Sequence, residues 1–130
     1  RAAVGWDAAR LAMILAVHEA RCGPSFASSE VYLNVAGGYR LTDPAADLAV
    51  AAALISALSE KPVPSEAVVF GEIALSGEIR QVAHAGLRLR EAAKLGFEAG
   101  WVPEGVAATD GLSAAHFGKL RALVEHILQS

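Results

Sequence analysis

Two acidic residues frame the start of a long apolar stretch, LTDPAADLAVAAALISAL, at residues 41–58. Asp43 and Asp47 flank Pro44–Ala45–Ala46. A helix that begins here directs a partial positive charge and free N–H groups outward, which suits a nucleophile and a developing anion. The residues between the acids carry no nucleophile, however. The alternatives are an active site, the remains of one, or only a helix cap.

Basic side chains gather further along the chain, in the predicted helix at residues 86–95. At about 100° per residue, Arg90 and Lys94 share the face opposite to its apolar stripe. That face is either solvated or a patch that binds a partner. Arg88 flanks the stripe and therefore borders the buried side.

Several kinds of chemistry are excluded by missing motifs. The sequence contains neither G-x-x-x-x-G-K-[ST] nor G-x-G-x-x-G, so we expect no nucleotide cofactor in this chain. Cys22 is its single cysteine, which excludes an internal disulfide and is typical of a small buried hydrophobic residue. Histidines are too scattered to predict a metal site, and surface or helix-flank positions are expected for them. They are His18, His84, His116 and His126.

Length and composition predict one domain that covers residues 1–130. Hydrophobic residues make up 54% and aromatic residues 6%, so small aliphatic side chains must form the core. The net charge of −3 argues against strong autonomous binding of nucleic acid, although a local basic patch remains compatible with it. The apolar run at 48–58 is too short to span a bilayer, and we expect no signal peptide. Because the first residue is Arg, we expect a fragment of a longer protein.

The elements alternate between helices and strands. Helices are expected from Asp7, as N-cap, to Arg21 with a stop at Cys22–Gly23–Pro24, and at 44–59, 86–95 and 119–128. Strands are expected at 30–35, 67–75, 78–82, 100–102 and 112–117, with a two-residue hairpin turn at Ser76–Gly77. The helix at 44–59 lacks a polar face and should be central and buried. This pattern predicts an α+β (α/β-like) fold, in which helices pack on a mixed sheet.

Two blocks together carry a family resemblance: NVAGGYRLTDPAADLAVAAALISAL (34–58) and VVFGEIALSGEIRQVAHAGLRLREAAKLGF (68–97). They resemble the C-terminal domain of the RadA (Sms) family of bacterial DNA repair proteins, and that domain is similar to the proteolytic domain of Lon proteases. The resemblance covers nearly the whole chain. It implies the fold that the Lon protease domain shares with the second domain of ribosomal protein S5.

The resemblance also implies which residues of this chain stand at the catalytic positions of Lon-type peptidases. Lon-type peptidases use a serine at the start of the long buried helix and a lysine base on a later helix. Here the serine position matches Ala45 and the lysine position matches Arg88, which stays protonated in proteins. The expected site is therefore a pseudo-active site without catalytic residues. We hypothesise that Arg88 pairs with Asp43 or Asp47; the alternative is that Asp43 only caps the helix and Asp47 is solvated.

By resemblance, the expected function is a non-proteolytic scaffold in a DNA repair and recombination ATPase of the cytoplasm. The implied partners are other copies of the chain in a hexameric ring, a RecA-like ATPase domain of the same protein, and DNA, which the isolated domain is expected to bind weakly. The candidates for DNA contact are Arg80, Arg88, Arg90 and Lys94. The alternative is a working Ser–Lys peptidase, which the residues at 45 and 88 disfavour. No membrane partner is expected.

Overall fold

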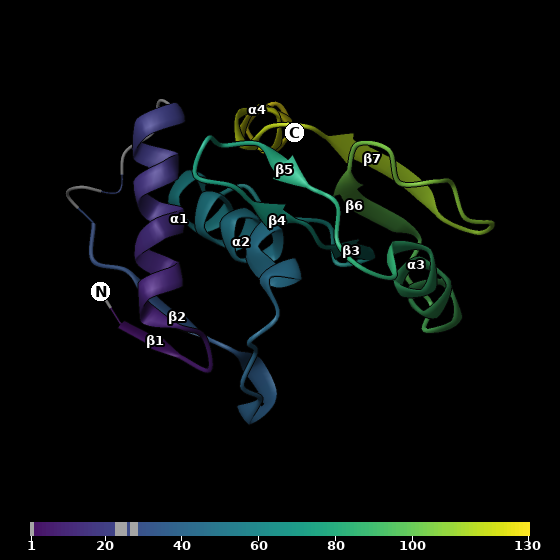
Figure 1. The fold of residues 1–130 in the computed structure, drawn as a ribbon, viewed down its shortest axis with the longest axis horizontal. Helices are drawn as coiled ribbons and strands as arrows, with labels where there is room; N and C mark the ends of the chain where they lie inside the picture. Colours follow the sequence, from purple (N-terminus) through teal and green to yellow (C-terminus); the bar gives the residue numbers. More distant parts are fainter. Residues whose placement is uncertain (1, 23–25, 27–28) are drawn as a thin grey trace.

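The computed structural model describes residues 2–22, 26 and 29–130. Its helices are α1 (Ala8–Arg21), α2 (Asp47–Ser59), α3 (Ala85–Lys94) and α4 (Leu120–Leu128), with short 3-10 helices η1 (Ala36–Gly38) and η2 (Pro44–Ala46). Its strands are β1 (Ala2–Val4), β2 (Tyr32–Asn34), β3 (Ala67–Val69), β4 (Glu72–Ile73), β5 (Ile79–Arg80), β6 (Ala99–Pro103) and β7 (Ser113–Phe117). The fold is α+β, as the alternation of elements predicts, and Figure 1 shows α1 and α3 at opposite ends of the long axis.

The helix starts follow from their capping residues. Asp7 accepts a hydrogen bond from the Ala9 amide at 2.8 Å and begins α1. Asp43 does the same for the Ala45 amide at 2.9 Å, and Pro44 then opens η2, which leads into α2. The predicted end of the first helix is confirmed at Cys22, which is its C-cap. The rest of that stop signal, residues 23 and 24, lies outside the described residues.

The strands form three small sheets within the described chain instead of one mixed sheet. β1 and β2 are parallel, β3–β6–β7 form a parallel sheet, and β4 and β5 are antiparallel. The strand predicted at 67–75 is broken because Gly71 directs its backbone to the start of α2. Its amide donates to the Ala45 carbonyl at 2.8 Å, and its carbonyl accepts from the Leu48 amide at 3.0 Å.

Two other strand predictions need correction. The two-residue turn at Ser76–Gly77 is wrong, because Ile73 faces Ile79 and the connection between them is longer. Gly77 still supplies the left-handed conformation of that turn, with φ of 89°. β1 was not predicted from its three small residues, and it pairs with the shorter strand that the structure forms within 30–35.

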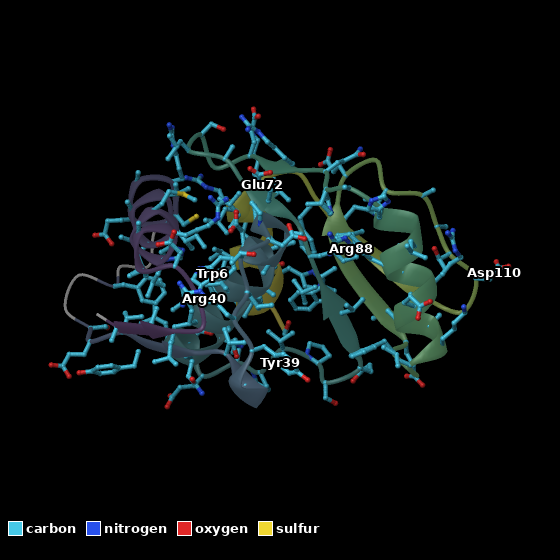
Figure 2. All side chains as sticks on the ribbon, turned by 60° about the horizontal axis from the view of Figure 1, so that its bottom comes forward. Trp6, Tyr39, Arg40, Glu72, Arg88 and Asp110 are labelled. Carbon is cyan, nitrogen blue, oxygen red and sulfur yellow. The ribbon has the colours of Figure 1, made fainter. Side chains whose placement is uncertain are left out.

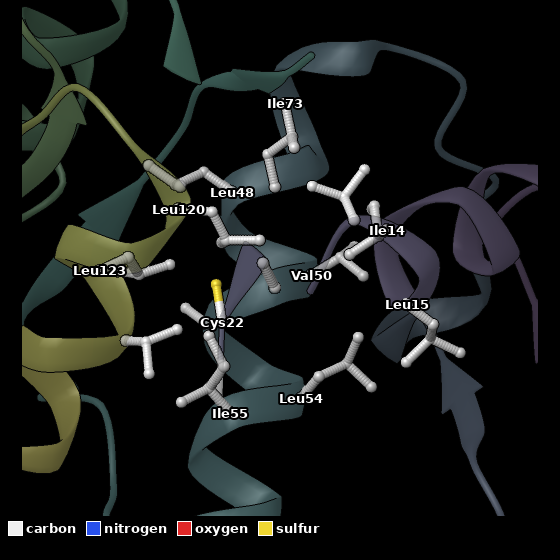
Figure 3. Close-up of a cluster of buried hydrophobic side chains, with 14 of the residues drawn as sticks. Ile14, Leu15, Cys22, Leu48, Val50, Leu54, Ile55, Ile73, Leu120 and Leu123 are labelled. Atoms are coloured by element: carbon white, nitrogen blue, oxygen red, sulfur yellow. The ribbon is translucent and has the colours of Figure 1, made fainter. Parts of the chain in front are cut away.

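The main core surrounds α2, whose lack of a polar face predicted its central position. Leu48 is fully buried and Ile55 is 2% exposed. Figure 3 shows side chains of α1 and α4, among them Ile14 and Leu123, packed on opposite sides of this helix. One face of the β3–β6–β7 sheet closes the same core.

The other face of that sheet carries a smaller apolar cluster. Leu89 of α3 is 1% exposed and packs with Phe70, Val102 and Val106. Gly100 allows this approach, since a Cβ there would lie 2.9 Å from Leu89 Cδ2. No helix in the described part of the chain is long and apolar enough to cross a membrane.

Candidate functional site

The backbone N–H groups at the start of α2 are not available to a ligand, because each is bonded within the protein. The Ala45 amide donates to the Asp43 carboxylate, and the Ala46 amide donates to the Asp43 carbonyl at 3.1 Å. The Asp47 amide donates to Pro44, and the Leu48 amide donates to Gly71. Each N–H group from 45 to 48 therefore already has an acceptor, and none is left to stabilise an oxyanion.

Ala45 sits at the centre of this helix start and is 2% exposed. Its methyl group provides no nucleophile, and its burial keeps it away from a substrate. Its carbonyl instead accepts from the Gly71 amide at 2.8 Å, which ties η2 to the segment before β4.

Arg88 of α3 reaches across to the same place. Its Nη2 donates to Asp43 Oδ2 at 2.9 Å, and its Nε donates to the Ala83 carbonyl at 2.9 Å. The guanidinium carbon also lies 5.9 Å from the centre of the Phe70 ring, which is within cation–π range. Figure 2 shows Arg88 between α3 and the body of the molecule. The side chain thus joins α3 to the mouth of α2.

Asp47 occupies a different environment from the solvated one that we considered. It is fully buried, and its carboxylate accepts from Arg10 Nε at 2.6 Å and from Arg10 Nη2 at 2.5 Å. It also accepts from the Ile73 amide at 3.0 Å. Of the two acids proposed as partners of Arg88, Asp43 is the one that meets it. Asp47 instead joins α2 to α1 through Arg10 and to β4 through the Ile73 amide.

The acids and bases of this region stabilise each other's charged forms. The Ala45 amide, and then Arg88, lower the pKa of Asp43 from its ordinary value of 3.8. The hydrogen bonds from Arg10 to Asp47 raise the pKa of Arg10, which therefore remains a cation. Arg10 is the residue that sequence reasoning missed. Its position on the inner side of the first predicted helix, four residues before Ile14, was the available signal.

The predicted basic candidates come from two elements. Arg80 lies on β5, whereas Arg90 and Lys94 lie on α3, and all three are exposed. Lys94 is 3.6 Å from Glu91 on its own helix. Arg88 differs from them because its guanidinium is already held by Asp43 and Ala83.

The remaining candidates show no reactive arrangement. Cys22 is 5% exposed, and burial raises the pKa of its thiol. His18 is buried with its ring 4.8 Å from the Phe26 ring, and it lies on the inner face of α1 with Leu11, Ile14 and Leu15. His126 instead packs its ring edge against Trp101. Among the described residues, no three His, Cys, Asp or Glu side chains come together in a way that could hold a metal ion.

Comparison with known proteins assigns the chain to a family. A family model described as "Subunit ChlI of Mg-chelatase" matches residues 3–105. A DNA repair protein RadA from Brucella abortus is 60% identical over 105 residues, which are 81% of this chain and 22% of that protein. The RadA of Rickettsia felis is 63% identical over 97 residues, 75% of this chain and 22% of that protein.

A more distant relative covers more of the chain. The RadA of Mycolicibacterium smegmatis is 46% identical over 126 residues, which are 96% of this chain and 27% of that protein. The chain therefore spans about a quarter of the length of the curated relatives it matches.

Proposed function

The chain belongs to the family described as subunit ChlI of Mg-chelatase and is homologous to a segment of DNA repair proteins named RadA, and from this we propose that it serves as a non-proteolytic, Lon-like scaffold in DNA repair. In this proposal it organises a ring of copies beneath a RecA-like ATPase domain of the same protein, in the cytoplasm. The observation that carries the proposal is the buried Ala45 at the helix start, with Arg88 fastened to Asp43 beside it.

Three features at the start of α2 and at the neighbouring residue 88 support the absence of peptidase activity. Position 45 lacks a hydroxyl, and position 88 holds a guanidinium that cannot act as a base at neutral pH. The backbone donors that could hold an oxyanion are already bonded within the protein. Restoring any one of these features alone would leave the other two missing.

DNA contact is supported by the exposed cations. Arg80 and Arg90 are exposed and have no ion pair among the described residues, whereas Lys94 lies 3.6 Å from Glu91 and Arg88 would first have to leave Asp43. With a net charge of −3, one copy offers few phosphate contacts. A ring would repeat the same contacts several times, so that weak binding by each copy adds up.

The test combines three measurements on the 130-residue chain. We expect light scattering to give a mass above that of the monomer, and we expect no turnover of a labelled unfolded protein. Binding of a fluorescent DNA should weaken with salt, with a log–log slope of about −3 for three phosphate contacts. The matched variants are Arg90→Gln, which should reduce the slope by about 1, and Arg121→Gln, whose guanidinium already donates to the Arg21 carbonyl.

Each measurement can refute its own part of the proposal. Turnover of the labelled substrate would refute the non-proteolytic role. A strict monomer at high concentration would refute ring formation by this chain. Absence of DNA binding even at low salt would refute DNA contact by it.

A further inference from the structure

The molecule has an open, largely apolar groove where β2 begins and α2 ends. Its volume is about 330 Å³. Buried side chains line it together with exposed ones: Phe26, Val31 and Leu54 are buried, whereas Tyr32 is 72% and Leu58 37% exposed. The groove therefore presents apolar surface to a partner, which would gain free energy by removing that surface from water.

Two acids, Glu30 and Glu60, belong to the lining of the same groove. Both are exposed, and neither forms an ion pair within the described part of the chain. Glu30 accepts a hydrogen bond from the Tyr32 hydroxyl at 3.3 Å, and Lys61, which follows Glu60, donates instead to the Ser130 carbonyl at 3.0 Å. The groove thus combines apolar surface with two negative charges that no neighbouring cation neutralises.

The outer face of α3 has the complementary combination. Leu87 is 49% and Leu95 75% exposed, and at about 100° per residue both lie on the side of the helix that faces away from Leu89 and the sheet. Arg90 and Lys94 are exposed on the same side. Lys94 lies 3.6 Å from Glu91, whereas Arg90 has no ion pair among the described residues. This face is therefore apolar with a net positive charge.

The groove and the outer face of α3 lie far apart on one molecule. Figure 1 shows β2 and α3 toward opposite ends of the long axis, so the two surfaces can meet only when they belong to different copies. A contact between two different surfaces is head-to-tail, and it repeats from copy to copy until a ring closes. Opposite charges favour this pairing, because two grooves, or two α3 faces, would repel each other.

We propose that α3 of one copy docks in the groove between β2 and α2 of the next, with Leu87 and Leu95 against the apolar lining and the cations of α3 toward Glu30 and Glu60. This inference rests on the proposed ring and names the contact that would build it. Arg90 is also a candidate for DNA contact, and one guanidinium cannot serve both partners at once. The test therefore uses leucines, which have no part in the proposed DNA contact.

Light scattering on two single variants tests the contact, because each variant removes one of its two sides. Leu95→Asp places a carboxylate on α3, and Leu58→Asp places one at the groove. Each should raise the concentration at which half of the chain is assembled by about tenfold or more, as expected for the loss of one leucine from a buried contact. The matched controls are Leu75→Asp and Leu128→Asp, which are 76% and 38% exposed outside both surfaces and should assemble like the wild type.

An equimolar mixture of Leu95→Asp and Leu58→Asp should form dimers and nothing larger, because it retains one intact α3 face and one intact groove for each pair of chains. Far-UV circular dichroism should give the same spectrum for every variant, which separates a lost contact from lost folding.

The outcomes distinguish this contact from the ring itself. If the wild type assembles and only one variant, or neither, weakens assembly, the contact is overturned and ring formation stands. A mixture that remains monomeric at the highest concentration also overturns it, because a head-to-tail contact must survive in the mixture. A wild type that stays monomeric would refute ring formation and this contact together.

Discussion

Replacing Asp47 with alanine should destabilise the fold more than any change at the neighbouring Asp43. Asp47 is fully buried and accepts three hydrogen bonds, two from Arg10 and one from the Ile73 amide. Removal of one partner of a buried ion pair typically costs about 3–5 kcal/mol, because the other charge is left without compensation. We therefore expect a large loss in the free energy of unfolding.

Two features of the structure set where in that range the loss should fall. The Arg10 side chain is 26% exposed and lies 4.0 Å from Glu72, so it can partly return to water or to that acid. The Ile73 amide has no such relief, and an unbonded buried amide costs about 1–3 kcal/mol. The expected loss is about 3 kcal/mol, or roughly 12 °C in melting temperature for a domain of this size.

The assay is urea unfolding followed by far-UV circular dichroism, with Asp43→Ala as the matched control. Asp43 is a capping residue with a 57% exposed side chain, and its removal should cost about 1 kcal/mol. Asp47→Asn, which retains an acceptor for the Ile73 amide, should fall between the two. A loss below about 1 kcal/mol for Asp47→Ala, or one no larger than that of Asp43→Ala, would refute the reasoning.

Three further predictions concern the exposed ion pair and the thiol. Arg88→Ala should lower the free energy of unfolding by at most about 1 kcal/mol, as expected for an exposed pair, and an unchanged melting temperature would contradict a structural role for it. The pKa of Asp43 is lowered by the Ala45 amide and then by Arg88, so its contribution is complete above pH 3.8 and is lost as the pH falls through the lower folded pKa. The difference between the wild type and Arg88→Ala in urea midpoint should accordingly be constant near neutral pH and decrease in acid, where only the contacts of Arg88 with Ala83 and Phe70 remain; a difference that does not decrease would argue against the pair. Cys22 should react with a thiol reagent at least about tenfold more slowly in the folded chain than in urea, since burial protects it and raises its pKa, and equal rates would contradict this.

Local signals predicted much of this fold. Asp43 and Pro44 mark the start of the helix, the near absence of a polar face on α2 indicates its central place, and Gly96 closes α3 with φ of 95°. These features depend on residues close together in the chain. The alternation of helices and strands likewise predicted the fold class correctly, because it follows from local periodicity.

The interactions that sequence reasoning missed join distant segments. Asp47 and Arg10 are 37 residues apart, and nothing near either residue identifies the other as its partner. The break in the strand at 67–75 arises from hydrogen bonds between Gly71 and the start of α2, which local periodicity cannot indicate. Leu95, the last residue of the helix predicted at 86–95, is 75% exposed, and α3 ends one residue earlier at Lys94.

The separate apolar cluster beneath α3 has a consequence for how the molecule opens. This helix buries Leu89 and Ala92, whereas α2 lies within the main core, so α3 can detach at a lower free energy than the rest of the fold. Its amide hydrogens should then exchange with solvent through local opening, ahead of those of α2. The pair between Arg88 and Asp43 resists this detachment, and any ligand or neighbouring molecule that competes for Asp43 would make local opening of α3 more frequent while the central helix stays folded.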